Sequence, residues 1–155
     1  MMKYFTFFAI LFLPFTILQA GGGKPKIALR IHLQSEGALP SDKIVNVVLE
    51  KPPKTIAIVP IPELSELNLI DAQPYSDLPN SALLTFNVHG TRVLNVTTTA
   101  NRGKHLVVFI NGRVVYAPII DTTLPNGKLL IPNNVTEEEL IELQKWAKRN
   151  KKKKI

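Results

Sequence analysis

Residues 103–120 read GKHLVVFINGRVVYAPII, and this stretch predicts the centre of the fold. Two apolar runs rich in β-branched residues, 106–110 and 114–120, flank Asn111 and Gly112. Asn-Gly is the pair that most readily adopts positive φ at both central positions of a type I′ turn. We therefore expect a β-hairpin with its turn at these two residues.

The second arm of this hairpin, 114–120, predicts a strand at the edge of a sheet. It has almost no polar residues, which indicates that both of its faces are covered. Pro118 has no backbone N–H to donate, so the arm must lie on an edge or bend at this residue.

Further segments upstream predict additional strands. Residues 27–33 alternate apolar and polar side chains, which is typical of a half-buried strand and places His32 on the exposed face. A hairpin is expected from 69–75 and 82–88 around a turn-rich loop. Extended segments are also expected at 44–49, 55–61 and 129–131, with one helical turn over 63–68.

A helix is expected over 137–149. Thr136 lies three residues before Glu139 and forms a capping box with it, and acidic residues open the helix while cations close it. Residues 91–101 remain open between helix and strand, because their apolar spacing suits a helix face while four threonines favour a strand.

The first twenty residues predict a secretory signal peptide. A short basic start precedes a mostly apolar run at 4–18, and Ala20 offers a small residue at a cleavage point. The run is shorter than the roughly 20 residues that span a bilayer, and an uncleaved anchor is the alternative. We expect an exported protein, periplasmic or extracellular or membrane-associated, with a flexible junction over 21–26.

The composition predicts one domain over 27–149 that folds without disulfides. The chain of 155 residues is 45% apolar and has no cysteine, which excludes thiol catalysis and cysteine metal sites. Its net charge of +7 resides in the C-terminal tail, 150–155, and the end of the preceding helix.

This basic end is a candidate contact for an anionic membrane surface, and a solvated helix end is the alternative. No aromatic residue lies among the tail lysines to stack on bases, so we expect no specific nucleic-acid site. The candidate contact residues are Lys148, Arg149, Lys151, Lys152, Lys153 and Lys154.

No catalytic or metal-binding pattern is present in the sequence. No serine has nucleophile-elbow spacing, and no histidine or acidic cluster has metal-ligand spacing. We expect no enzyme activity, no cofactor and no metal, with His89 and His105 at surface positions. The opposing hypothesis needs a cleft that brings one of these histidines beside Asp71 or Asp121.

Residues 82–143 resemble the head subdomain of the first periplasmic domain of SecD, the accessory subunit of the bacterial protein-export channel. The similarity is carried by a strand, a Gly-initiated helix ending in threonines, Gly-Lys, a strand, a Gly turn, Val-Val-x-Ala-Pro-Ile-Ile, a second Gly turn, a strand and Thr-x-Glu-Glu. The positions that carry the motif are Gly103, Asn111, Gly112, Ala117, Pro118, Gly127 and Thr136.

The resemblance implies that residues 91–101 are helical. It also implies an α+β fold in which two helices cover one face of an antiparallel sheet, a ferredoxin-like arrangement, with extra strands at the N-terminus. Asn133 and Asn134 stand where the family usually has glycine, and Asn tolerates the left-handed conformation. A complete SecD has several membrane-spanning helices, and this chain has no such stretch after residue 20, so we expect a stand-alone exported domain.

The resemblance favours a non-enzymatic exported binding module that contacts unfolded polypeptide or export-channel membrane proteins. An exposed strand edge such as that near Pro118 would accept a peptide as an added strand. The alternative function is a membrane-surface adaptor that uses the C-terminal lysines.

Overall fold

The computed structural model describes residues 26–35, 43–50 and 53–153. The predicted signal peptide, most of the junction and Lys154 lie outside them. The elements are β1 (Leu29–Leu33), β2 (Val45–Glu50), β3 (Pro53–Ile58), β4 (Leu64–Ser65), η2 (Glu66–Asn68), β5 (Leu69–Gln73), β6 (Ala82–Phe86), α1 (Val88–Ala100), β7 (Leu106–Ile110), β8 (Arg113–Tyr116), β9 (Lys128–Ile131) and α2 (Glu137–Lys152).

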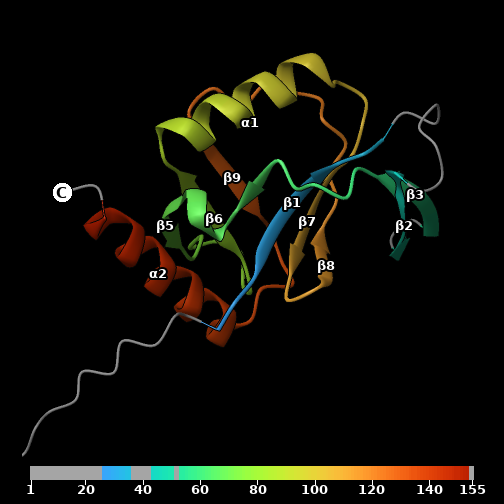
Figure 1. Ribbon diagram of the computed structural model, residues 1–155. Helices are drawn as coiled ribbons and strands as arrows, with labels where there is room; N and C mark the ends of the chain where they lie inside the picture. Colours follow the sequence, from blue (N-terminus) through green and yellow to red (C-terminus); the bar gives the residue numbers. More distant parts are fainter. Residues whose placement is uncertain (1–25, 36–42, 51–52, 154–155) are drawn as a thin grey trace, which may run out of the picture.

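The strands form three antiparallel sheets in the described residues, with the orders β4-β1-β7-β8, β5-β6-β9 and β2-β3. Helix α2 packs along β5, and α1 packs against β4 and β6 (Figure 1). The α+β class is confirmed. The single sheet that we expected is divided, and the ferredoxin-like arrangement stays a prediction.

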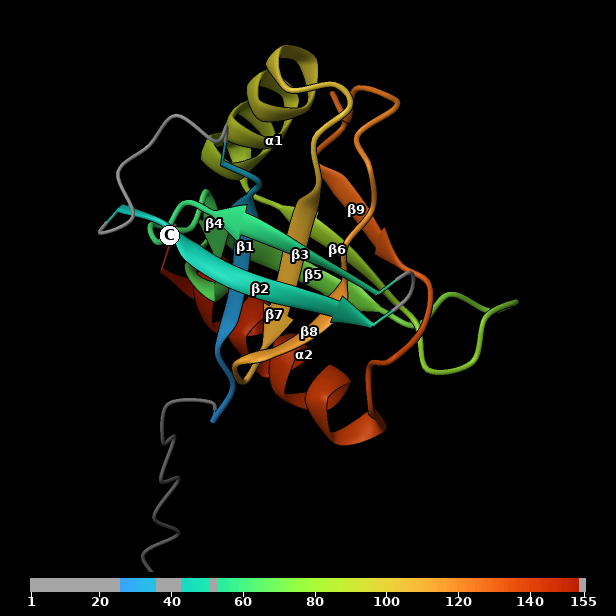
Figure 2. The same cartoon turned by 90° about the vertical axis from the view of Figure 1, so that its right-hand side faces the viewer.

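The position of strand β7 between two apolar cores explains why its sequence is apolar throughout. Leu106, Val108 and Ile110 point into the main core between the two larger sheets and the helices, whereas Val107 points to the opposite face. The β2–β3 hairpin covers that opposite face (Figure 2). A strand covered on both faces needs no polar alternation.

His32, which we expected on an exposed face, is buried in the structure. Its Nδ1 lies 2.8 Å from the carbonyl oxygen of Val59, and its ring is edge-on to Phe109. The alternation along β1 was interpreted as one buried and one solvated face. The prediction was wrong because β1 is an inner strand and a second layer of the protein covers its polar face.

Helix α1 confirms the helical conformation implied by the resemblance. Asn87 caps it by accepting a hydrogen bond from Gly90 N at 2.8 Å. The helix contains the threonines that favoured a strand. One of them, Thr98, donates from Oγ1 to Leu94 O at 2.8 Å within the helix and accepts from Leu124 N at 3.0 Å outside it. Tertiary contacts therefore outweigh their propensity.

Helix α2 begins at the predicted capping box but extends to Lys152, three residues beyond the expected end. Asn150 is buried, and its Nδ2 donates to Glu66 O at 2.8 Å and to Leu69 O at 2.7 Å. These bonds fix the last turns of the helix to the domain. Among the described helices, none has the length and hydropathy needed to cross a membrane.

We predict that Gly127→Ala destabilises the fold more than Gly103→Ala. Both glycines have positive φ, but a Cβ at Gly127 would lie 2.0 Å from Thr91 Oγ1, whereas nothing lies within 4 Å of one at Gly103. The expected losses of unfolding free energy are roughly 2–5 and 1–2 kcal/mol. Urea unfolding measures both, and equal losses would contradict the close approach of Gly127 to Thr91.

We predict that Asn150→Ala lowers the free energy of unfolding by roughly 1–3 kcal/mol, because it removes a buried side-chain donor from two carbonyl oxygens, of which only Glu66 O is known to keep another donor, the backbone N–H of Leu69. The exposed Gln144 on the same helix supplies the control, and Gln144→Ala should change stability little. The same urea unfolding measurement applies. Equal stability of the two variants would show that the helix end is not held by Asn150.

Candidate functional site

The hairpin turn has the geometry that Asn-Gly predicted. Asn111 and Gly112 have φ values of 51° and 79°. The turn also binds the start of the domain, since Asn111 N donates to Ala28 O at 2.9 Å and Asn111 Oδ1 accepts from Ala28 N at 3.0 Å. The predicted turn therefore also fixes the entry of the chain.

Arg113 connects the hairpin to the first turn of α2. Its Nη2 donates to both carboxylate oxygens of Glu139 at 2.9 Å and to Asn134 O at 3.1 Å. Glu139 also accepts from Thr136 N at 3.0 Å in the capping box. Asn134 has a φ of 63°, so this asparagine adopts the conformation for which the family uses glycine.

The other end of the hairpin is closed by backbone contacts. Gly103 N donates to Ile120 O at 2.8 Å, and Leu106 N donates to Pro118 O at 3.0 Å. Nδ1 of His105 lies 3.0 Å from Ala117 O. Strand β8 ends before the proline and is the edge strand of its sheet, as Pro118 predicted.

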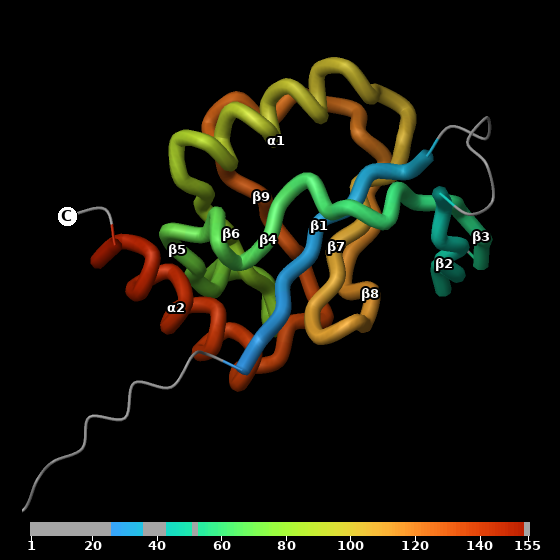
Figure 3. Tube along the Cα trace, viewed as in Figure 1, coloured from blue at the N-terminus to red at the C-terminus, as the bar shows by residue number. Residues whose placement is uncertain are grey.

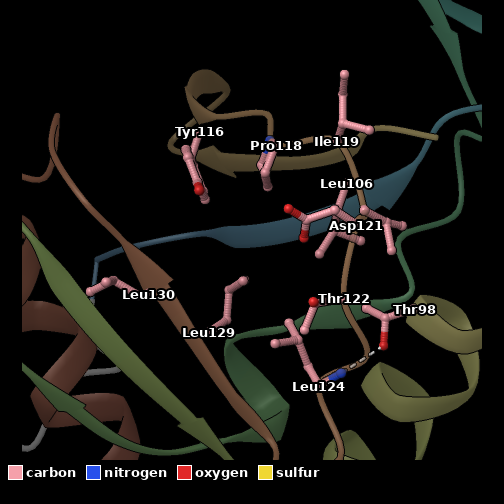
Figure 4. A pocket seen from close by; sticks show the side chains of 11 residues that line it. Thr98, Leu106, Tyr116, Pro118, Ile119, Asp121, Thr122, Leu124, Leu129 and Leu130 are labelled. Atoms are coloured by element: carbon pink, nitrogen blue, oxygen red, sulfur yellow. Dashed lines mark hydrogen bonds between the residues drawn. The ribbon is translucent and has the colours of Figure 1, made fainter. Parts of the chain in front are cut away.

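A pocket of about 220 Å³ lies beside this closed end, between β8 and β9. Figure 4 shows Tyr116 and Pro118 on one side and Leu129 and Leu130 on the other. The remaining lining residues are Thr98, Leu106, Ile119, Ile120, Asp121, Thr122 and Leu124. Both flanking strands are edge strands, and they belong to different sheets.

Besides two threonines, the largely apolar pocket is lined by two ionisable side chains, Tyr116 and Asp121. Burial raises the pKa of the Tyr116 phenol above its ordinary value, and the negative charge of Asp121 raises it further. The Tyr116 phenol therefore keeps its proton at neutral pH and is a hydrogen-bond donor, and the side-chain oxygens of Asp121 line the same pocket. Both groups can hydrogen-bond to polar groups of a bound molecule.

The histidines do not take part in this pocket. Neither His89 nor His105 is among its lining residues, although Asp121 is. His89 is exposed on α1, as expected. We expected His105 at the surface, but it is buried. Its Nδ1 contacts the carbonyl oxygen of Ala117, in the segment that follows β8. In the described ranges no three His, Asp or Glu residues cluster as a metal site would require.

The described cations of the C-terminal end lie on α2 and just after it. Lys148, Lys151, Lys152 and Lys153 are exposed, and the Arg149 guanidinium lies 5.5 Å from the Trp146 ring centroid. Helix α2 thus includes Asn150, Lys151 and Lys152 of the expected basic tail 150–155.

We did not predict from the sequence that Tyr116 and Asp121 line the same pocket. The one usable signal was a tyrosine in an otherwise aliphatic arm, and the contribution of Asp121 depends on a loop whose path the sequence does not predict.

We predict that Tyr116 ionises above the ordinary tyrosine value of 10.0. The raised pKa contributes stability that is fully present below pH 10.0 and is lost as the pH rises through the folded value. Asp121→Asn should lower this pKa without returning it to the ordinary value, because burial is the larger cause. Near-ultraviolet titration of the protein and of Tyr116→Phe isolates this residue; ionisation at or below the ordinary value would contradict the prediction.

Comparisons with known proteins agree with the resemblance seen in the sequence. The family model described as SecDF, P1 head subdomain, matches residues 42–146. A comparison with curated proteins finds no match.

Two solved SecDF structures share this fold. One, of a membrane component that enhances protein export, has a TM-score of 0.56 at 21% identity, with 80% of this chain and 63% of that chain covered. The other, SecDF in a super-membrane-facing form, has a TM-score of 0.57 at 21% identity, with coverage of 80% and 19%. The chain thus spans less than two thirds of either. With the family model matched over most of its length, the chain belongs to the SecDF P1 head subdomain family.

Proposed function

We propose that this chain is a non-enzymatic, exported binding module that contacts extended polypeptide during protein export. Membership of the SecDF P1 head subdomain family links the chain to export. The observation that carries the proposal is the apolar pocket between the edge strands β8 and β9. The signal peptide that we predict over residues 1–20 would direct the domain to the periplasmic or outer side of the membrane.

Edge strands bind extended peptides through backbone hydrogen bonds, and neighbouring pockets receive alternate side chains. Strand β8 pairs with β7 along one edge, and the pocket lies toward its other edge. A polypeptide added along β8 would place a side chain against Pro118 and Leu129. Such binding depends on backbone and apolar contacts, which suits a protein that meets many exported sequences.

The polar pair restricts which segments bind well. The Tyr116 hydroxyl offers a donor to a peptide carbonyl, and the Asp121 carboxylate accepts from an amide or attracts a cation. Acidic side chains are disfavoured beside Asp121. We therefore expect preference for apolar segments flanked by neutral or basic residues.

The test uses the chain from residue 21 onward. An unfolded secretory polypeptide is titrated into it, and the NMR chemical shifts of the backbone amides are measured. Shifts are expected in residues 116–121 and 129–130. Ile119→Asp should weaken binding by about tenfold or more, because it introduces a second carboxylate at the pocket.

Val48→Asp is the matched control. Val48 is 69% exposed on β2 and does not line the pocket, while Ile119 is 56% exposed, so both variants should fold. Absence of shifts at millimolar polypeptide would remove the proposal. Equal weakening by the two variants would move the binding site away from the pocket.

A further inference from the structure

The outward face of α2 carries a row of cations, which we call the basic stripe: Lys145, Lys148, Arg149 and Lys152. The buried residues of this helix are Leu143, Trp146, Ala147 and Asn150. At 3.6 residues per turn, the spacing i, i+3, i+4 and i+7 places the stripe on the side of the helix away from these residues, with Arg149 at the margin next to Trp146.

The charge of the stripe is largely uncompensated. The sequence has no acidic residue after Glu142. Lys145 Nζ pairs with Glu142 Oε1 at 2.5 Å, whereas Lys148 and Lys152 are exposed and make no ion pair within the described part of the chain. The flanking Lys151 and Lys153 are exposed too and add to the same positive field.

The stripe is held in place. Asn150 fixes the last turns of α2 to η2 and β5 through its two hydrogen bonds. The Arg149 guanidinium lies 5.5 Å from the Trp146 ring centroid, so the packed side of the helix also positions this cation. These cations belong to a preformed surface, which costs less conformational entropy to dock than a flexible tail.

The described chain enters the domain beside the stripe. Figure 3 shows the first described residues beside α2. Lys26 N donates to Glu142 Oε2 at 2.9 Å, and the other oxygen of this carboxylate binds Lys145. The apolar run at 4–18 ends eight residues before Lys26, a span of at most about 28 Å. If the run at 4–18 is kept as an uncleaved anchor, the alternative to a cleaved signal peptide, it would therefore hold α2 close to the bilayer surface.

We propose that the basic stripe docks on the headgroups of anionic phospholipids, with α2 lying along the membrane surface. Cations near such a surface each strengthen binding by roughly fivefold, and the binding weakens with salt. Ile141 is 43% exposed on the same outward face, one turn before Lys145, and offers an apolar contact to the lipid interface. The stripe shares no residue with the polypeptide pocket, so this surface is independent of the proposed function.

The composition of this face favours lipid over nucleic acid. Single-stranded nucleic acids bind through cations combined with exposed aromatic rings on which bases stack. The aromatic residue of α2, Trp146, is only 8% exposed and packs into the core. Charge with an aliphatic neighbour is the pattern of an interfacial helix.

The test measures binding of the full chain to phosphatidylcholine vesicles with and without phosphatidylglycerol, over a range of salt concentrations. The variant Lys145→Gln, Lys148→Gln, Arg149→Gln, Lys152→Gln removes the stripe. The matched control Lys54→Gln, Arg92→Gln, Arg102→Gln, Lys128→Gln removes the same charge from exposed positions off α2. Comparing the two lipid compositions separates charge-dependent docking from insertion of the apolar run.

We expect the stripe variant to lose at least about 50-fold of its affinity for anionic vesicles, while the control retains most of it. Affinity for pure phosphatidylcholine should be the same in all three proteins. Equal losses in the two variants, or no preference for anionic lipid, would overturn the proposal and leave a solvated helix face. Binding of a single-stranded RNA oligonucleotide is measured for the same three proteins. If the stripe variant loses RNA binding while its vesicle binding is unchanged, the proposal is overturned in favour of a nucleic-acid site. Urea midpoints confirm that both variants fold.

Discussion

The pairing of β1 with β7 is the interaction on which the rest of the structure depends. It joins residues about eighty positions apart, from Leu29 opposite Ile110 to Leu33 opposite Leu106. Without β1, the hairpin of β7 and β8 would be an isolated ribbon, and two strands alone are marginally stable in water. The two bonds between Ala28 and Asn111 set the register at one end, because they fix the chain where it meets the turn.

A buried carboxylate couples this pairing to the last helix. Glu66 accepts from Leu29 N at 3.0 Å and from the guanidinium of Arg30, and its own carbonyl accepts from Asn150. A buried charge without partners would be costly, so these donors must come together when the domain folds. The network therefore connects the first strand, the short η2 turn and the end of α2, three segments that are separated in the sequence.

Local patterns predicted the elements well and their layers poorly. Asn111-Gly112 and the box formed by Thr136 and Glu139 encode their structures within a few residues, and both were predicted. The burial of His32 depends instead on a hairpin that packs over β1 from another part of the chain. The end of α2 was misplaced for the same reason, because Asn150 has carbonyl partners more than eighty residues away.

The pocket was beyond local reasoning since it lies between edge strands of different sheets. Tyr116 and Leu129 are thirteen positions apart, but they line one pocket because β8 and β9 lie at the edges of two different sheets where a single sheet was expected. The division into separate sheets is what creates the two edges on either side of the pocket. One continuous sheet would pair β8 with a neighbour, whereas two sheets leave both edges beside an apolar pocket. The basic stripe lies on α2, which packs along β5 at the opposite edge of the second sheet from β9. Polypeptide bound at β8 would therefore leave the stripe uncovered, and a domain docked through α2 would keep its pocket accessible.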